Sequence, residues 1–64
     1  MDEYLETLKE VIRDNFLVYG ADSGLKENAD IIMHWRDEGE IDEQQYKELR
    51  KYNRKVYSEL PLDM

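Results

Sequence analysis

Apolar side chains recur at intervals of three and four residues through three segments of the chain, and small breaks separate these segments. This spacing places apolar residues on one face of an α-helix and does not match the two-residue alternation of a half-buried strand. The breaks fall at Gly20, Gly24, Gly39 and Pro61. The sequence therefore predicts an all-α fold, a small three-helix bundle with helices at about 2–19, 24–38 and 42–59 in a single helical domain, 1–64.

Each predicted helix has one apolar arc and one charged arc when its residues are stepped by about 100°. The arc of 2–19 consists of Tyr4, Leu5, Leu8, Val11, Ile12, Phe16, Val18 and Tyr19. The other two arcs consist of Leu25, Ala29, Ile31, Ile32, Met33 and Trp35, and of Tyr46, Leu49, Tyr52, Val56, Tyr57 and Leu60. At the ends, Asp2 is predicted to cap the first helix, Gly20 to close it, and Ser23 or alternatively Asn28 to cap the second.

The segment HWRDEGEIDEQQYKE, residues 34–48, contains six carboxylates and has to be compared with a calcium loop. With Gly39 at the glycine position of an EF-hand, His34, Arg36 and Gln45 would occupy positions that require oxygen ligands, the last of them a bidentate glutamate. The segment therefore predicts no calcium site.

A corner between two helices accounts for the same residues better. Gly39 is predicted to end the second helix, and Asp42 to form a capping box with Gln45 at the start of the third. Ile41 is predicted to contact Tyr46 as a hydrophobic staple across this start.

This corner also carries a family resemblance. The run Gly39-Glu40-Ile41-Asp42-Glu43-Gln44-Gln45-Tyr46 resembles the G-x-I-T-x-E-E-F core of SHOCT-type short helical hairpins, and the resemblance covers residues 32–53. It implies a non-catalytic packing or oligomerisation element. The short, acidic, tyrosine-rich chain is also similar in style to small accessory proteins of phages and mobile elements.

Charge and composition indicate a folded acidic protein. Sixteen acidic and nine basic residues give a net charge of −7, while 41% of the residues are hydrophobic, which is too many for a typical disordered tail. The chain has no cysteine, its first ten residues lack the basic start of a signal peptide, and it has no apolar run of the roughly 18 residues that span a membrane. We expect a cytoplasmic protein, in a bacterial or host cell, with no membrane partner.

The chemistry-bearing residues do not form a recognisable catalytic or metal motif. His34 is the single histidine, with Asp30 and Glu38 four residues to either side. A straight helix holds groups at i−4 and i+4 too far apart to close readily on one ion. We expect no enzyme activity, no metal site and no cofactor.

The charged arcs are the strongest candidates for a binding surface. The predicted partner-binding acidic face consists of Glu3, Glu6, Glu10, Asp14, Glu27, Asp30, Asp37 and Glu38. Such a surface attracts a protein with a basic surface, although the same carboxylates also keep a small protein soluble, and both explanations stay open. The third helix carries a basic face of Lys47, Arg50, Lys51, Arg54 and Lys55, but the net charge disfavours direct nucleic-acid binding.

Polar residues interrupt the apolar arcs at Asn15, Asn28, Arg36 and Asn53, so these groups either pair inside the bundle or face a partner. Asn53 lies where a coiled-coil seam would hold an amide that fixes register. The candidate interface residues are Trp35, Arg36, Asn53, Tyr52 and Tyr57. The leading hypothesis is a non-catalytic protein that binds and modulates or inhibits another protein, in one form by occupying a basic nucleic-acid-binding surface. The alternative is a structural module that self-associates as a homodimer or a larger helical assembly.

Overall fold

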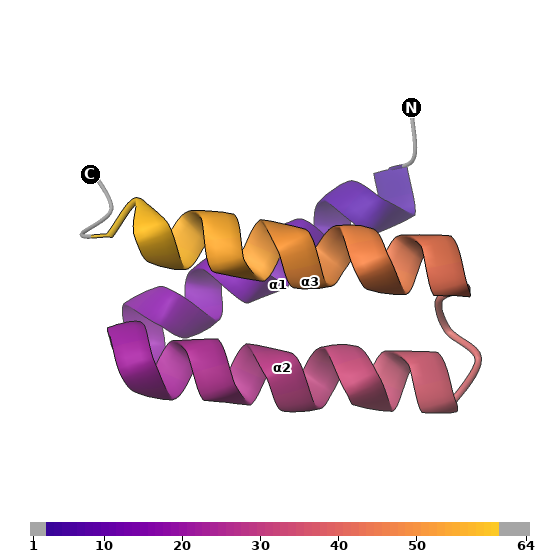
Figure 1. Ribbon diagram of the computed structural model, residues 1–64, viewed down its shortest axis with the longest axis horizontal. Coiled ribbons are helices and arrows are strands. Elements are labelled where there is room, and N and C mark those ends of the chain that lie inside the picture. The colour runs from indigo at the N-terminus through magenta and orange to yellow at the C-terminus, as the bar shows by residue number, and fades with distance from the viewer. Residues whose placement is uncertain (1–2, 61–64) are drawn as a thin grey trace.

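The computed structural model describes residues 3–60 and contains three α-helices: α1 (Glu3–Tyr19), α2 (Ala21–Asp37) and α3 (Glu43–Ser58). In Figure 1, α2 and α3 run side by side in opposite directions, and α1 passes obliquely behind α3 to end near the start of α2. Each helix packs against both of the others. The predicted all-α three-helix bundle is confirmed. The predicted cap Asp2 and the stop at Pro61 lie outside the described residues.

A single residue, Gly20, joins α1 to α2. Its backbone has φ 89° and ψ 178°, a region that is essentially restricted to glycine, and its N–H donates to the Phe16 carbonyl over 3.0 Å. The prediction that Ser23 or Asn28 caps α2 is wrong, because α2 begins at Ala21 and Gly20 occupies the cap position without a side-chain bond. The cap position coincides with the residue that turns the chain, and its positive φ strains the residues that usually cap helices.

Gly24 lies inside α2, where the backbones of α1 and α2 approach each other closely. A Cβ atom placed on Gly24 would lie 2.9 Å from the Phe16 Cα and 3.2 Å from the Asn15 carbonyl oxygen. Both of these are backbone atoms, which cannot move aside unless the helix moves with them. The sequence analysis counted Gly24 among the breaks between helices, whereas in the fold it lies inside α2 and permits the helix crossing.

The corner between α2 and α3 has the predicted construction. At its first half, Gly39 has φ 76°, its N–H donates to the Arg36 carbonyl over 3.1 Å, and the Glu40 N–H donates to the Trp35 carbonyl over 2.8 Å. This pair of bonds is a Schellman motif, which satisfies carbonyls at the end of α2.

At the second half, the Asp42 side chain accepts from the Gln45 N–H over 2.7 Å, and the Gln45 side chain accepts from the Asp42 N–H over 2.9 Å. This is the predicted capping box. Ile41 and Tyr46 are both buried in the core, as the staple requires.

The core lies between the three helices and consists of Leu5, Leu8, Ile12, Phe16, Ile32, Trp35, Ile41, Tyr46, Leu49 and Val56. The predicted arcs were too wide. Tyr4, Val18, Tyr19, Met33 and Tyr57 are exposed, and Val18 retains 73% of its accessible surface. Two neighbouring helices cover only part of each arc, so residues at the arc edges remain outside.

The close crossing at Gly24 leads to a stability prediction. Gly24→Ala gains about 1 kcal/mol of helix propensity but must push Phe16 and α1 away, so we expect a net loss of about 1–2 kcal/mol. Urea unfolding followed by circular dichroism measures this change. Ser23→Ala, one position away on the exposed side of the same helix, is the control and should stay within about 0.5 kcal/mol of the parent. A more stable Gly24→Ala variant would contradict the close packing described here.

Candidate protein-binding surfaces

Three asparagines, one from each helix, form a hydrogen-bond network at the centre of the bundle. The Asn28 Nδ2 group of α2 donates to the Ile12 carbonyl of α1 and to the Asn53 Oδ1 of α3, both over 3.0 Å. The Asn28 Oδ1 accepts from the Asn15 Nδ2 over 2.8 Å, and the Asn53 Nδ2 donates to the Leu25 carbonyl over 3.2 Å. Asn28 has 0% of its surface exposed, yet both hydrogens of its amide have acceptors.

The network shows whether the asparagines in the apolar arcs pair inside the bundle or face a partner. Asn15, Asn28 and Asn53 pair with one another inside the chain, and no buried side-chain polar atom among residues 3–60 lacks a partner. Asn53 and Trp35 are buried in the closed bundle, so the surface open to a partner does not include them. Of the other candidate interface residues, Arg36 and Tyr52 are half-buried and Tyr57 is exposed.

All eight residues of the predicted acidic face are exposed. Two of them have cationic neighbours: Glu6 lies 3.7 Å from the Lys9 Nζ, and Asp37 lies 3.8 Å from the Arg36 Nε. The other six, Glu3, Glu10, Asp14, Glu27, Asp30 and Glu38, form no ion pair within the described part of the chain. None of these six carboxylates is held in an ion pair, so their charges contribute to an attractive field for a positively charged surface.

An apolar seam accompanies these carboxylates on the α1–α2 side of the bundle. Tyr4, Val11 and Val18 follow one another every seven residues along the flank of α1 that also carries Asn15, whose bond to Asn28 shows that this flank faces α2. On α2, Ile31 lies seven residues after Gly24, the residue that meets α1. We call Tyr4, Val11, Val18 and Ile31 the α1–α2 seam.

Acidic residues border the α1–α2 seam. Glu27 and Glu38 lie four residues before and seven residues after Ile31, on the same flank of α2, and Asp14 lies between Val11 and Val18 on α1. Val11 and Ile31 are half-buried against the core, whereas Tyr4 and Val18 are exposed. The sequence had assigned all four seam residues to the core, and the seven-residue spacing of Tyr4, Val11 and Val18 was the signal for a separate stripe.

The basic face of α3 is also exposed. Its members Lys47, Arg50, Lys51, Arg54 and Lys55 form no ion pair among residues 3–60. Two guanidinium groups meet the buried Tyr46 ring, with the Cζ of Arg36 4.2 Å and that of Arg50 5.6 Å from its centroid. Both arginines therefore contact Tyr46, and Arg50 also donates a hydrogen bond to its hydroxyl over 3.4 Å.

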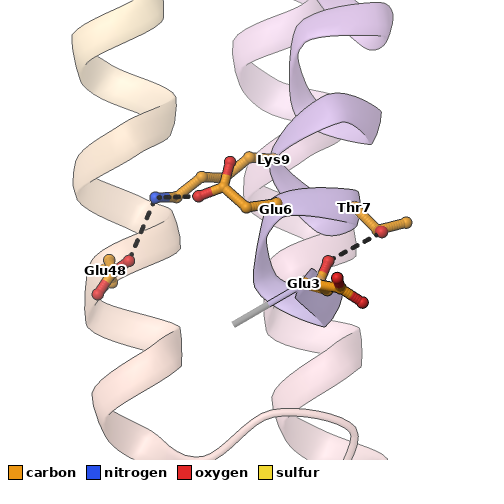
Figure 2. A network of polar contacts seen from close by, with 5 residues as sticks. All are labelled: Glu3, Glu6, Thr7, Lys9 and Glu48. Atoms are coloured by element: carbon orange, nitrogen blue, oxygen red, sulfur yellow. Dashed lines mark hydrogen bonds and ion pairs between the residues drawn. The ribbon is translucent and has the colours of Figure 1, made fainter. Parts of the chain in front are cut away.

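Lys9 connects the α1 and α3 helices and was missed by the sequence analysis. Its Nζ lies 3.3 Å from a Glu48 carboxylate oxygen and 5.4 Å from the centre of the Tyr52 ring. Figure 2 shows Lys9 between Glu6 and Glu48, while the Glu3 carboxylate points away from α3. Glu6 thus already has a cationic neighbour within the chain.

The side chains that could bind a metal ion do not cluster in the described part of the chain. No group of three or more histidine, aspartate or glutamate side chains is placed to hold a metal ion within residues 3–60. His34, Asp30 and Glu38 are all exposed on α2 and form no such group. None of the three helices has the length and apolar character needed to cross a membrane.

One exposed hydrogen bond ties the end of α3 to the start of α2. The Tyr57 hydroxyl donates to the Asp22 carboxylate over 2.8 Å, and the Tyr57 ring lies 6.4 Å from that of Phe16. The hydrogen bond to Asp22 raises the pKa of Tyr57 above its ordinary value of 10.0, with smaller contributions from the negative charge of Asp22 and from burial. Tyr57 therefore belongs to the bundle's own contacts, although part of its surface stays open.

Comparisons with protein families, with curated proteins and with solved structures find no significant match to this chain. The SHOCT-type resemblance of the α2–α3 corner stays a prediction.

The asparagine network can be tested by Asn28→Asp, because aspartate has nearly the same shape as asparagine. Asn28→Asp replaces the donating amide by a carboxylate, so Asn53 and the Ile12 carbonyl lose their donor and a buried charge is left without a cation. We expect a loss of at least about 3 kcal/mol in the free energy of unfolding, against about 1 kcal/mol for Asn15→Ala at the rim. Chemical denaturation measures both, and equal losses would mean that Asn28 is not the centre of the network.

The Tyr57–Asp22 bond predicts a dependence on alkaline pH. Because the folded pKa of Tyr57 is raised, its contribution to stability is fully present below pH 10.0 and is lost as the pH rises through the folded value. Tyr57→Phe should show no such loss relative to the parent, since it lacks the ionising group. Titrating the ring by NMR in the parent and in Asp22→Asn checks the cause. An unchanged Tyr57 pKa in Asp22→Asn would rule Asp22 out.

Proposed function

We propose that this chain is a non-catalytic protein-binding module, and that its α1–α2 seam with the bordering carboxylates docks on a basic surface of a cytoplasmic partner protein. The observation that carries the proposal is the combination of exposed apolar side chains and unpaired acids on one side of the bundle. Protein interfaces commonly combine an apolar centre with a polar rim, and that is the pattern of these residues.

The acidic rim and the seam would contribute differently to binding. Glu27, Glu38 and Asp14 would accelerate association with a cationic partner and select against acidic ones, with an effect that weakens as salt rises. Tyr4, Val18 and the exposed parts of Val11 and Ile31 would supply apolar area that salt does not weaken. A partner that matches both has lysine or arginine side chains around an apolar ridge.

One specific form of this function is the inhibition of a nucleic-acid-binding protein. Carboxylates of α1 and α2 would occupy the positions that phosphates take on such a surface, and the bound module would block access to the nucleic acid. The net charge of −7 supports this form, because it repels the nucleic acid while it attracts the protein that binds it.

The binding surface can be mapped with a defined probe. A synthetic helical peptide with lysines on one face and leucines on the other should shift the NMR signals of Tyr4, Val11, Val18 and Ile31. Glu27→Gln with Glu38→Gln should weaken its binding by about fivefold to tenfold, because two rim charges are lost. The affinity of the parent should fall as the salt concentration rises.

The matched control removes the same charge from elsewhere. Glu43→Gln with Glu59→Gln changes the net charge equally at the two ends of α3, outside the α1–α2 seam, and should leave the affinity within about twofold of the parent. If both double variants weakened binding equally, or if the signal shifts spread over all three helices, attraction by net charge alone would explain the binding and the proposed surface would be wrong.

A further inference from the structure

A continuous helix through Gly20 is a simple alternative to the turn that joins α1 to α2. In that alternative, α1 would be free to cover the α2 and α3 of a second copy of this chain. Gly20 alone separates α1 from α2. The backbone bonds on both sides of it already have helical spacing: the Gly20 N–H donates to the Phe16 carbonyl over 3.0 Å and the Gly24 N–H to the Gly20 carbonyl over 2.8 Å. The connection between α1 and α2 is therefore a one-residue break between two helices and contains no loop.

Closing that interruption would add backbone hydrogen bonds. In a continuous helix, the N–H groups of residues 21–23 would donate to the carbonyls of residues 17–19, four positions earlier. In the bundle, α2 begins with no side-chain cap on these groups. A helix that ran without a break from Glu3 to Asp37 would satisfy them and would let Gly20 leave its unusual backbone conformation.

Two of the contacts between α1 and α2 are symmetric in sequence about Gly20. Phe16 meets Gly24, four residues on each side of the joint, and Ile12 accepts a bond from Asn28, eight residues on each side. Two continuous helices lying antiparallel, with their Gly20 residues side by side, would reproduce these contacts between chains. The α1 of one copy would then cover the α2 and α3 of the other.

We propose that this chain forms an exchanged dimer in which α1 and α2 fuse through Gly20 into one helix and each α1 packs on the α2 and α3 of the second copy. The asparagine network and the apolar core are retained in that dimer, because the same residues meet across the chains. The dimer also carries two copies of the acidic surface, which doubles the number of sites offered to one large partner. This inference does not depend on the identity of that partner.

Gly20→Ala tests the proposal, and Gly39→Ala is its matched control. Both glycines have positive φ, and a Cβ on either would meet nothing within 4 Å, so alanine strains the backbone of the closed bundle at both positions without a steric clash. Only at position 20 does alanine also favour the fused helix. At each of the two positions 20 in the dimer, alanine should favour the fused helix over the closed turn by about tenfold. The dimerisation constant of Gly20→Ala should therefore rise about a hundredfold over that of the parent.

Light scattering over a wide range of protein concentration measures the association. The expected result is a dimer for Gly20→Ala at concentrations where Gly39→Ala, although less stable than the parent, is a monomer. A Gly20→Ala variant that stays monomeric and is only destabilised, as Gly39→Ala is, would overturn the proposal.

The unaltered chain supplies a second test that does not depend on how the variants fold. Equal amounts of isotope-labelled and unlabelled parent protein, unfolded together and refolded at high concentration, should yield a dimer fraction with NMR contacts between chains linking Phe16 to Gly24 and Ile12 to Asn28. A dimer that showed these contacts only within each chain, or a refolded sample without a dimer fraction, would show that α1 is not exchanged.

Discussion

The side chain of Asn28 determines how the three helices fit together. Apolar surfaces attract one another without a preferred direction, so a core of leucine, isoleucine and valine alone would tolerate small shifts between helices. The Asn28 amide must meet the Ile12 carbonyl and the Asn53 side chain at once, and its oxygen must meet Asn15. A shift of one residue in any helix would leave a buried amide without partners, which costs more than the same shift in an apolar core.

This network in turn depends on how closely α1 approaches α2. Asn28 is short, and it reaches a main-chain carbonyl of α1 because the two helix backbones are close together there. Gly24, one turn before Asn28, provides that closeness, since any side chain at this position would meet the Phe16 backbone. Gly20 completes the arrangement by reversing the chain within one residue. A glycine at the turn, a glycine at the crossing and an asparagine in the core are thus successive parts of one joint, spaced four residues apart along the chain.

The parts of the fold that the sequence predicted are those that local contacts determine. The α2–α3 corner was predicted in detail because Gly39, Asp42 and Gln45 interact within a few residues of one another. The start of α2 was predicted wrongly, because Ser23 and Asn28 both have the chemistry of a helix cap, whereas Gly20 takes the cap position and only the neighbours of Asn28 on the other helices reveal that it is a core residue. The exposure of Val18 could not be read from the apolar arc either, since it depends on which sides of α1 the other two helices cover. The acidic residues were correctly predicted to be exposed, whereas the apolar seam beside them follows from the helix crossing.

Charge has little part in holding the bundle together, and this frees the surface for another role. Lys9–Glu48 is the one ion pair that joins two different helices within residues 3–60, and both of its side chains retain contact with solvent. An exposed pair of this kind contributes about 1 kcal/mol or less, so packing and the asparagine network must supply most of the stability. The unpaired acids of α1 and α2 can therefore be altered with small effects on folding. Their charge raises the self-repulsion of so small a protein, and a basic partner that neutralised it would relieve that repulsion on binding.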